Sequence, residues 1–179
     1  MVTNNWFIYT NKKEIVMKLN LIIIVTIMSL LQSCNGQNMD EVINRLDNTN
    51  FSDLKGLSIY FRSKGNERST NIYFVNVFSG KCSPYVVEVD KSKIDDLKIK
   101  NDLVLKTCDK DYLDKETIKA AIEKYLELNI CLIQVDSFGN VYINPYEQEP
   151  PTLLKKSDST PPKDINQFEL YKGNWYIRK

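Results

Sequence analysis

Histidine is absent from all 179 residues of the chain. Without an imidazole, the sequence cannot form a Ser–His–Asp or Cys–His catalytic set, an HExxH site or an imidazole zinc site. Phosphate-binding loops of the GxGxxG and GxxxxGK[ST] kinds are also missing. Carboxylates are then the main catalytic side chains left, because a glycosidase needs only two Asp or Glu side chains at a suitable separation. We expect no cofactor.

The sequence also lacks an apolar run long enough to span a bilayer, which needs about 20 residues. Its most apolar stretch, residues 21–31, has the length of the apolar region of a signal peptide, and Lys18 supplies the preceding positive charge. Met17 is a natural start for such a leader. Residues 1–16 would then be an upstream extension, either from a misassigned start codon or as a real segment in which Lys12 and Lys13 lengthen the basic region.

The leader ends in Leu31-Gln32-Ser33-Cys34. These four residues resemble the lipobox of bacterial lipoproteins, and residues 17–34 together resemble a type II signal peptide. The resemblance implies that the Cys34 thiol receives a diacylglycerol, that a peptidase cleaves before Cys34, and that the new amine is acylated, for example with palmitate. The alternatives are an ordinary secretory signal, in which Cys34 is incidental, and an N-terminal helix of the core.

The residue after the lipobox is Asn35 rather than Asp. In the lipoprotein family, an aspartate there often retains the protein in the inner membrane, so the resemblance implies the outer membrane of the cell envelope. The abundance of Asn, Lys, Ile and Tyr resembles the amino-acid composition of proteins from Bacteroidetes-like bacteria. Their surface lipoproteins carry acids soon after the cysteine, whereas Asp40 and Glu41 come later here. Both the periplasmic side and the outer surface therefore stay open.

Charge disfavours a nucleic-acid partner. Cleavage before Cys34 would remove three lysines and one glutamate and leave 21 basic and 22 acidic residues. Proteins that bind nucleic acid normally carry a strong basic excess. We expect a signal peptide over residues 1–33, a lipid-anchored tether over 34–39 and a single domain over 40–179.

Three cysteines lie beyond the expected anchor, at Cys82, Cys108 and Cys131. An oxidising compartment lets one pair form a disulfide, and spacing alone does not decide which pair. Cys131 begins the apolar segment CLIQV and is expected to be a small buried residue. Cys82 and Cys108 both lie near expected strand ends, so they are the preferred pair.

Residue patterns predict an α+β fold, with a mainly antiparallel sheet packed on one or two helices. One helix is expected near residues 40–46 and a second over 115–128, where apolar residues recur at helical spacing after a capping Asp114. Expected strands are 56–62, 71–78, 83–90, 102–107 and the two arms of the hairpin 131–144.

The C-terminal third is rich in proline and aromatic residues. Five of the six prolines lie between residues 145 and 162, so we expect an irregular loop over 145–163, with Leu153 and Leu154 docking onto the domain. A last hairpin is expected to turn at residues 172–174. Trp175 and Ile177 would share one face, and Phe168 and Leu170 would supply the partner face.

Two groups of residues are weak site candidates. Asp109, Asp111 and Asp114 could offer oxygen ligands to a metal ion, but they lack the glycine and the final acid of a calcium loop, so a turn leading into a capped helix is favoured. Tyr146 and Trp175 could contact a partner, because aromatic residues are frequent interface anchors. Packing within strands is the more common role of such residues.

These observations predict a lipid-anchored envelope protein that acts as a non-catalytic binding module. Its partner would be another envelope protein, as for an immunity protein that neutralises a toxin in the periplasm, or for an envelope assembly factor. One alternative is a small envelope hydrolase that uses paired carboxylates on a glycan. The other is a structural lipoprotein that binds a ligand in a sheet-lined cleft.

Overall fold

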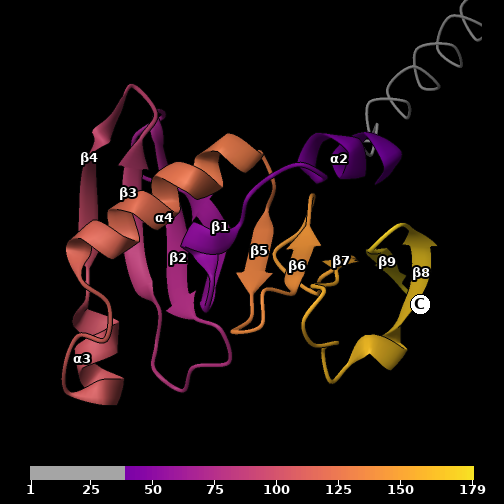
Figure 1. The fold of residues 1–179 in the computed structure, drawn as a ribbon. Coiled ribbons are helices and arrows are strands. Elements are labelled where there is room, and N and C mark those ends of the chain that lie inside the picture. Colours follow the sequence, from indigo (N-terminus) through magenta and orange to yellow (C-terminus); the bar gives the residue numbers. More distant parts are fainter. Residues whose placement is uncertain (1–38) are drawn as a thin grey trace, which may run out of the picture. The chain divides into compact units, whose positions relative to one another are not determined.

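The computed structural model describes residues 39–179, apart from the side chains of Ile94 and Asp95. The expected signal peptide, Cys34 and nearly all of the tether lie outside the described residues. The described part has an α+β fold in which three helices accompany nine strands (Figure 1). None of its helices has the length and apolar character needed to cross a membrane.

All nine strands belong to one antiparallel sheet, in the order β4-β3-β2-β1-β5-β6-β7-β9-β8. A meander of four strands comes first. The chain then passes through two helices and returns beside β1, where Ile59 of β1 lies opposite Ile133 of β5. The strands are β1 (Leu57–Lys64), β2 (Thr70–Val77), β3 (Tyr85–Asp90), β4 (Lys93–Lys100), β5 (Leu132–Val135), β6 (Val141–Asn144), β7 (Leu153–Lys155), β8 (Phe168–Lys172) and β9 (Trp175–Arg178).

Helix α4 (Lys115–Leu128) crosses the strands of the first meander (Figure 1). It has the bounds predicted from the sequence. The Asp114 side chain accepts a hydrogen bond from the Thr117 main-chain N–H, and Asn129 ends the helix in the left-handed conformation. Tyr125 of the helix contacts Tyr73 of β2 edge to face, with 5.5 Å between the ring centroids. The buried residues of α4 are Ile118, Ala121, Ile122, Tyr125 and Leu128.

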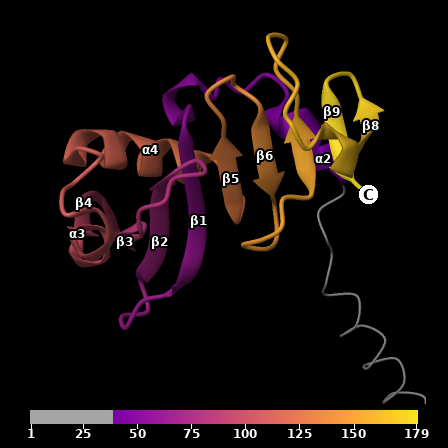
Figure 2. The ribbon, with the colours of Figure 1, turned by 90° about the horizontal axis from the view of Figure 1, so that it is seen from below.

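Helix α2 (Met39–Leu46) lies near β7, β8 and β9 (Figures 1 and 2). Its Val42, Ile43 and Leu46 are buried on one face, as the spacing predicted. Lys172 of β8 donates a hydrogen bond to the Asn44 side chain, and Arg45 donates one to the main-chain carbonyl of Leu128. Contacts of α2 therefore reach both the C-terminal hairpin and the end of α4.

The strand predicted at residues 102–107 is wrong. That segment is helix α3 (Asp102–Cys108), and the charged segment before it forms β4 instead. Alternation would have buried Leu103 and Leu105, whereas α3 buries Val104 and leaves those two leucines 40% and 43% exposed. Charged side chains suit β4 because it is an edge strand, where they discourage pairing with another chain.

Two expectations for the C-terminal third also need correction. The proline-rich segment 145–163 is not wholly irregular, because Leu153 and Leu154 belong to β7 and are fully buried. The last hairpin forms as predicted, with Phe168 buried on β8. Leu170, however, is 64% exposed and does not pack as expected, because β8 is the other edge of the sheet.

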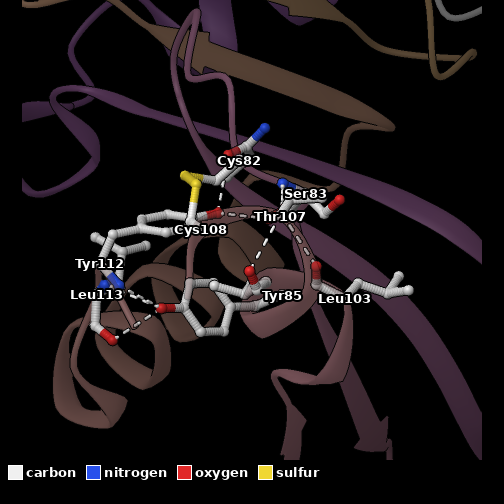
Figure 3. Close-up of a disulfide and its surroundings, with 10 residues drawn as sticks. Cys82, Ser83, Tyr85, Leu103, Thr107, Cys108, Tyr112 and Leu113 are labelled. Atoms are coloured by element: carbon white, nitrogen blue, oxygen red, sulfur yellow. Dashed lines mark hydrogen bonds between the residues drawn. A yellow bond between two sulfur atoms is a disulfide. The ribbon is translucent and has the colours of Figure 1, made fainter. Parts of the chain in front are cut away.

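A disulfide joins Cys82 to Cys108 (Figure 3), the pair preferred from the sequence. Cys131 is free. The disulfide ties the loop before β3 to the end of α3. Beside it, the Ser83 main-chain N–H donates to Thr107 Oγ1, at 2.9 Å. The Tyr85 hydroxyl accepts hydrogen bonds from the main-chain N–H groups of the two residues before Asp114, Tyr112 and Leu113, at 2.9 and 3.1 Å. These bonds hold the segment between α3 and α4 against the sheet.

Replacing Cys82 and Cys108 together by serine is expected to lower the free energy of unfolding by about 3 kcal/mol, because the bond closes a loop of moderate length in the unfolded chain. Urea denaturation of the oxidised proteins measures the change. Cys131→Ser is the matched control, since it removes a thiol and keeps the bond. Equal stability of the double variant and the control would contradict the structural role of the disulfide.

Candidate functional site

A cleft of about 380 Å³ opens between the loop that follows α2 and the segment that follows β7. This volume lies within the range of small-molecule sites. Residues 49–52 and Lys55 line it from the α2 side, and residues 155–158 with Asn174 line it from the β7 side. Val135, Gly139 and Val141, at the turn between β5 and β6, complete the lining. Four separate parts of the chain thus build the cleft.

Lys155, the last residue of β7, is the most constrained cation of the cleft. Its ammonium donates a hydrogen bond to the Asp47 main-chain carbonyl. It also lies 5.5 Å from the ring centroid of Phe51 and 5.3 Å from that of Trp175. Aromatic ring faces attract cations, so the two rings and the carbonyl together hold this ammonium in place. Burial lowers the pKa of the Lys155 amine, and the nearby charge of Asp47 opposes that shift.

Trp175 supports Lys155 from inside the domain. It is 1% exposed, and its indole N–H donates to Asp47 Oδ1 at 2.7 Å. Trp175 is therefore a packing residue, which was one of the two roles expected from the sequence, and not an exposed contact for a partner. Trp175 therefore affects the cleft through its ring and through Asp47.

A buried amide fixes the segment after β7. Asn140 is fully buried, and its side-chain oxygen accepts a hydrogen bond from the Ser157 main-chain N–H at 2.9 Å. Its amide nitrogen donates to Asp136 Oδ2 at 2.7 Å and to the Thr160 carbonyl at 2.9 Å. The Asp136 carboxylate also accepts main-chain hydrogen bonds from Phe138 and Asn140, so all these groups are satisfied within the network. The β5–β6 turn thereby positions the wall that carries Lys156.

The cleft has an excess of positive charge. Its lining contains Lys55, Lys155 and Lys156, against the single exposed acid Asp158. The ion pairs among the described residues lie elsewhere and involve none of these lysines. Lys155 lies near the Asp47 carboxylate, and all three ammonium groups can donate hydrogen bonds to an anion. The arrangement therefore suits the binding of an anionic group.

The acidic candidates Asp109, Asp111 and Asp114 have separate structural roles. Asp109 ends α3 in the left-handed conformation, with φ of 59°. The Asp111 carboxylate accepts hydrogen bonds from the Asn101 side chain at 2.9 and 3.0 Å. Asp114 caps α4, and the hydrogen bonds from Thr117 lower the pKa of its carboxyl. Among the described side chains, those of residues 39–179 without Ile94 and Asp95, no group of three or more Cys, Asp or Glu could hold a metal ion.

The other predicted residues lie apart from the lysine-lined cleft. Tyr146 follows β6 and is 40% exposed. Cys131 lies before β5 and is only partly buried, so the expectation of a buried residue was wrong; it lines a second hollow of about 220 Å³ together with Tyr73 and Tyr125. Burial raises the pKa of the Cys131 thiol, which makes it a weak nucleophile at neutral pH.

Sequence reasoning missed the lysines of the cleft and Asn140. The available signal was the pair Lys155-Lys156, which directly follows two consecutive leucines within the proline-rich segment. An apolar pair that docks onto the domain brings the next residues to its surface in a fixed position. Nothing in the sequence places Lys55 beside that pair, because one hundred residues separate Lys55 from Lys155.

Asn140→Ala is expected to lower the free energy of unfolding by about 2 kcal/mol, because it leaves the buried Ser157 N–H and part of the Asp136 carboxylate without partners. Urea denaturation measures the loss. Hydrogen exchange at the Ser157 amide should accelerate in the same variant. Asn66→Ala, at an exposed turn position, is the control. Unchanged protection at Ser157 would show that Asn140 does not hold this wall.

Lys155 is expected to lose its proton at lower pH than exposed lysines do. Its side-chain NMR signal, identified by its absence from Lys155→Gln, should titrate with a midpoint below the ordinary value of 10.5. Burial penalises the charged form, so folding stability should rise as pH increases from that lowered pKa toward the ordinary one. Trp175→Leu removes one ring and should change this midpoint. A midpoint equal to that of Lys110 would contradict the constrained position of Lys155.

Comparison with known proteins gives no counterpart for this chain: no family model, no curated protein and no solved structure matches it.

Proposed function

We propose that this protein is a lipid-anchored, non-catalytic binding protein of the cell envelope, held at the outer membrane through Cys34. The proposal joins two parts of the chain. The leader that ends in Leu31-Gln32-Ser33-Cys34 supplies the anchor. The domain after it, a sheet that we take to be packed on α4 and α2, supplies a rigid scaffold for a binding site.

The disulfide between Cys82 and Cys108 supports the envelope part of the proposal. Disulfides persist in oxidising compartments, such as the periplasm and the cell surface, and are rare in the cytosol. The bond thus agrees with a leader that directs the chain out of the cytosol, and it depends on different residues from those of the lipobox.

The observation that carries the binding function is the lysine-lined cleft. Lys55, Lys155 and Lys156 have no acidic partner in the ion pairs of residues 39–179, although the expected mature chain is close to neutral. Several hydrogen bonds and two aromatic rings hold the lining in place. Pre-positioned polar groups reduce the ordering cost of binding. An acidic surface of an envelope protein or an anionic ligand would complement this cleft.

The acids of the domain give less support to a hydrolase. Asp111 and Asp114 line a hollow of about 270 Å³, but Asn101 and Thr117 occupy their carboxylates with hydrogen bonds. Glu67, Glu88, Asp90 and Asp96 surround a hollow of about 90 Å³, which is small for a glycan. Glu88 pairs with Lys100, and hydrogen bonds from Ser92 lower the pKa of the Asp90 carboxyl. A general acid of a glycosidase needs a raised pKa instead. We therefore place the function in the cleft.

The experiment that tests this proposal combines anchorage with contact at the cleft. The wild-type chain, expressed in a bacterium with a lipoprotein pathway, should incorporate labelled palmitate and sediment with membranes. Cys34→Ala should lose the label and leave the membrane fraction, because the acyl chains are the anchor. Processing and membrane retention of Cys34→Ala like the wild type would contradict the anchor.

A photo-crosslinking residue placed at Ser52, on the rim of the cleft, should capture its ligand in cells. The same residue at Lys110, on the exposed turn after α3, is the matched control. The proposal expects a crosslinked species from position 52 alone, with a yield that falls in the Cys34→Ala background. Equal yields from both positions would assign no binding role to the cleft.

A further inference from the structure

We propose that the cleft between the loop after α2 and the segment after β7 binds a phosphate monoester, with Lys55, Lys155 and Lys156 as the residues that hold the phosphate. The proposal deepens the binding function above and rests on it, because it names the ligand class of the same cleft.

Charge gives the first argument. The lining residues carry three ammonium groups and one carboxylate, that of Asp158, which leaves a net charge of +2. The Asp47 carboxylate accepts the Trp175 indole N–H, and its charge also acts on Lys155, so the lining together with Asp47 carries a net charge of +1. A phosphate monoester carries a charge of about −1.5 to −2 at neutral pH. It therefore attracts the three ammonium groups more strongly than the single charge of a carboxylate does.

The type of cation gives the second argument. Arginine recognises planar carboxylates through two parallel hydrogen bonds, whereas lysine acts as a point charge that is common at phosphate sites. The lining contains three lysines and no arginine. Three point charges on opposite sides of a cleft can each donate to a different oxygen of a tetrahedral phosphate. A planar carboxylate has only two oxygens to accept them.

Lys155 is already in position before a ligand arrives. One of its three N–H groups donates to the Asp47 carbonyl, and the rings of Phe51 and Trp175 limit its movement. The other two N–H groups form no hydrogen bond with residues 39–179. Lys55 and Lys156 line different walls, and neither is in an ion pair with residues 39–179. We infer that Lys155 fixes the phosphate position and that the other two lysines close around it.

The size and the apolar part of the lining give the last argument. A volume of about 380 Å³ exceeds the needs of inorganic phosphate, and Phe51, Val135 and Val141 offer apolar surface. An organic group attached to the phosphate would bury these side chains. The monoester could come from a free metabolite or from the head group of a phospholipid, since both present the same chemistry.

Titration calorimetry on the detergent-solubilised full chain tests the ligand class. Phenyl phosphate is the probe, and benzoate has the same ring with a carboxylate. We expect phenyl phosphate to bind more tightly than benzoate and its affinity to fall with added salt. The combined variant Lys55→Gln/Lys155→Gln/Lys156→Gln should weaken the binding of phenyl phosphate by at least about tenfold. The control Lys91→Gln/Lys106→Gln/Lys110→Gln removes the same charge from exposed positions and should bind like wild type.

Vesicles distinguish the two sources. The Cys34→Ala chain is mixed with phosphatidylcholine vesicles with or without phosphatidic acid, whose head group is a phosphate monoester. If the chain binds vesicles with phosphatidic acid more strongly than vesicles without it, and the lysine variants lose this difference, the ligand is a lipid head group. If phenyl phosphate binds in calorimetry but the vesicles show no such difference, the ligand is a free ester. If the triple variant fails to fold by circular dichroism, Lys55→Gln/Lys156→Gln replaces it, because these side chains lie at the surface.

Equal affinity for benzoate and phenyl phosphate would overturn the phosphate assignment, and so would phosphate binding that survives in the folded lysine variants. No binding of either probe would overturn it as well. Crosslinking from position 52 is measured separately. If the cleft captures a protein but binds no phosphate, the proposed binding function stands and only the phosphate monoester is rejected as its ligand.

Discussion

The C-terminal hairpin joins the sheet through β7. The three residues of this strand, Leu153–Lys155, pair with β6 on one side and with β9 on the other, and no other strand of residues 39–179 pairs with β9 and with the rest of the sheet. Leu153 and Leu154 point to opposite faces and are both fully buried, which anchors the short strand on both sides. Lys155 comes next in the same strand, so the pairing that completes the sheet also sets the position of the constrained ammonium.

Local signals explain the parts of the fold that the sequence predicted. Helix α4 has a capping acid, apolar residues at helical spacing and an asparagine that ends it, and all three signals act within about one turn of the residues they affect. The prediction failed at residues 93–107. The two short segments there, which form β4 and α3, both show a weak alternation of apolar and polar residues, so the pattern did not separate strand from helix. In β4 the many charged side chains hide this alternation. The sheet tolerates these charges because β4 is an edge strand with one side unpaired.

The cleft could not be predicted in the same way. Its lining comes from the loop after α2, the β5–β6 turn, the segment after β7 and the turn before β9, which only tertiary pairing brings together. Composition also misled the prediction at β7, because prolines flank a strand of three residues, too short for a period of two to be visible. Asn140 occupied an expected turn, where asparagine is common, and its burial depends on the segment that folds over it.

A modest cleft can serve an anchored protein better than a free one. Charge complementarity from a few ammonium groups gives limited affinity in water, because salt screens exposed charges. A protein held on a membrane meets ligands of the same membrane at a high effective concentration, so a weak contact is occupied more often. Lipidation at Cys34 and a cleft with three lysines would thus act together. In the proposed function, the anchor would supply the local concentration, and the fixed position of Lys155 would supply selectivity among the anions present.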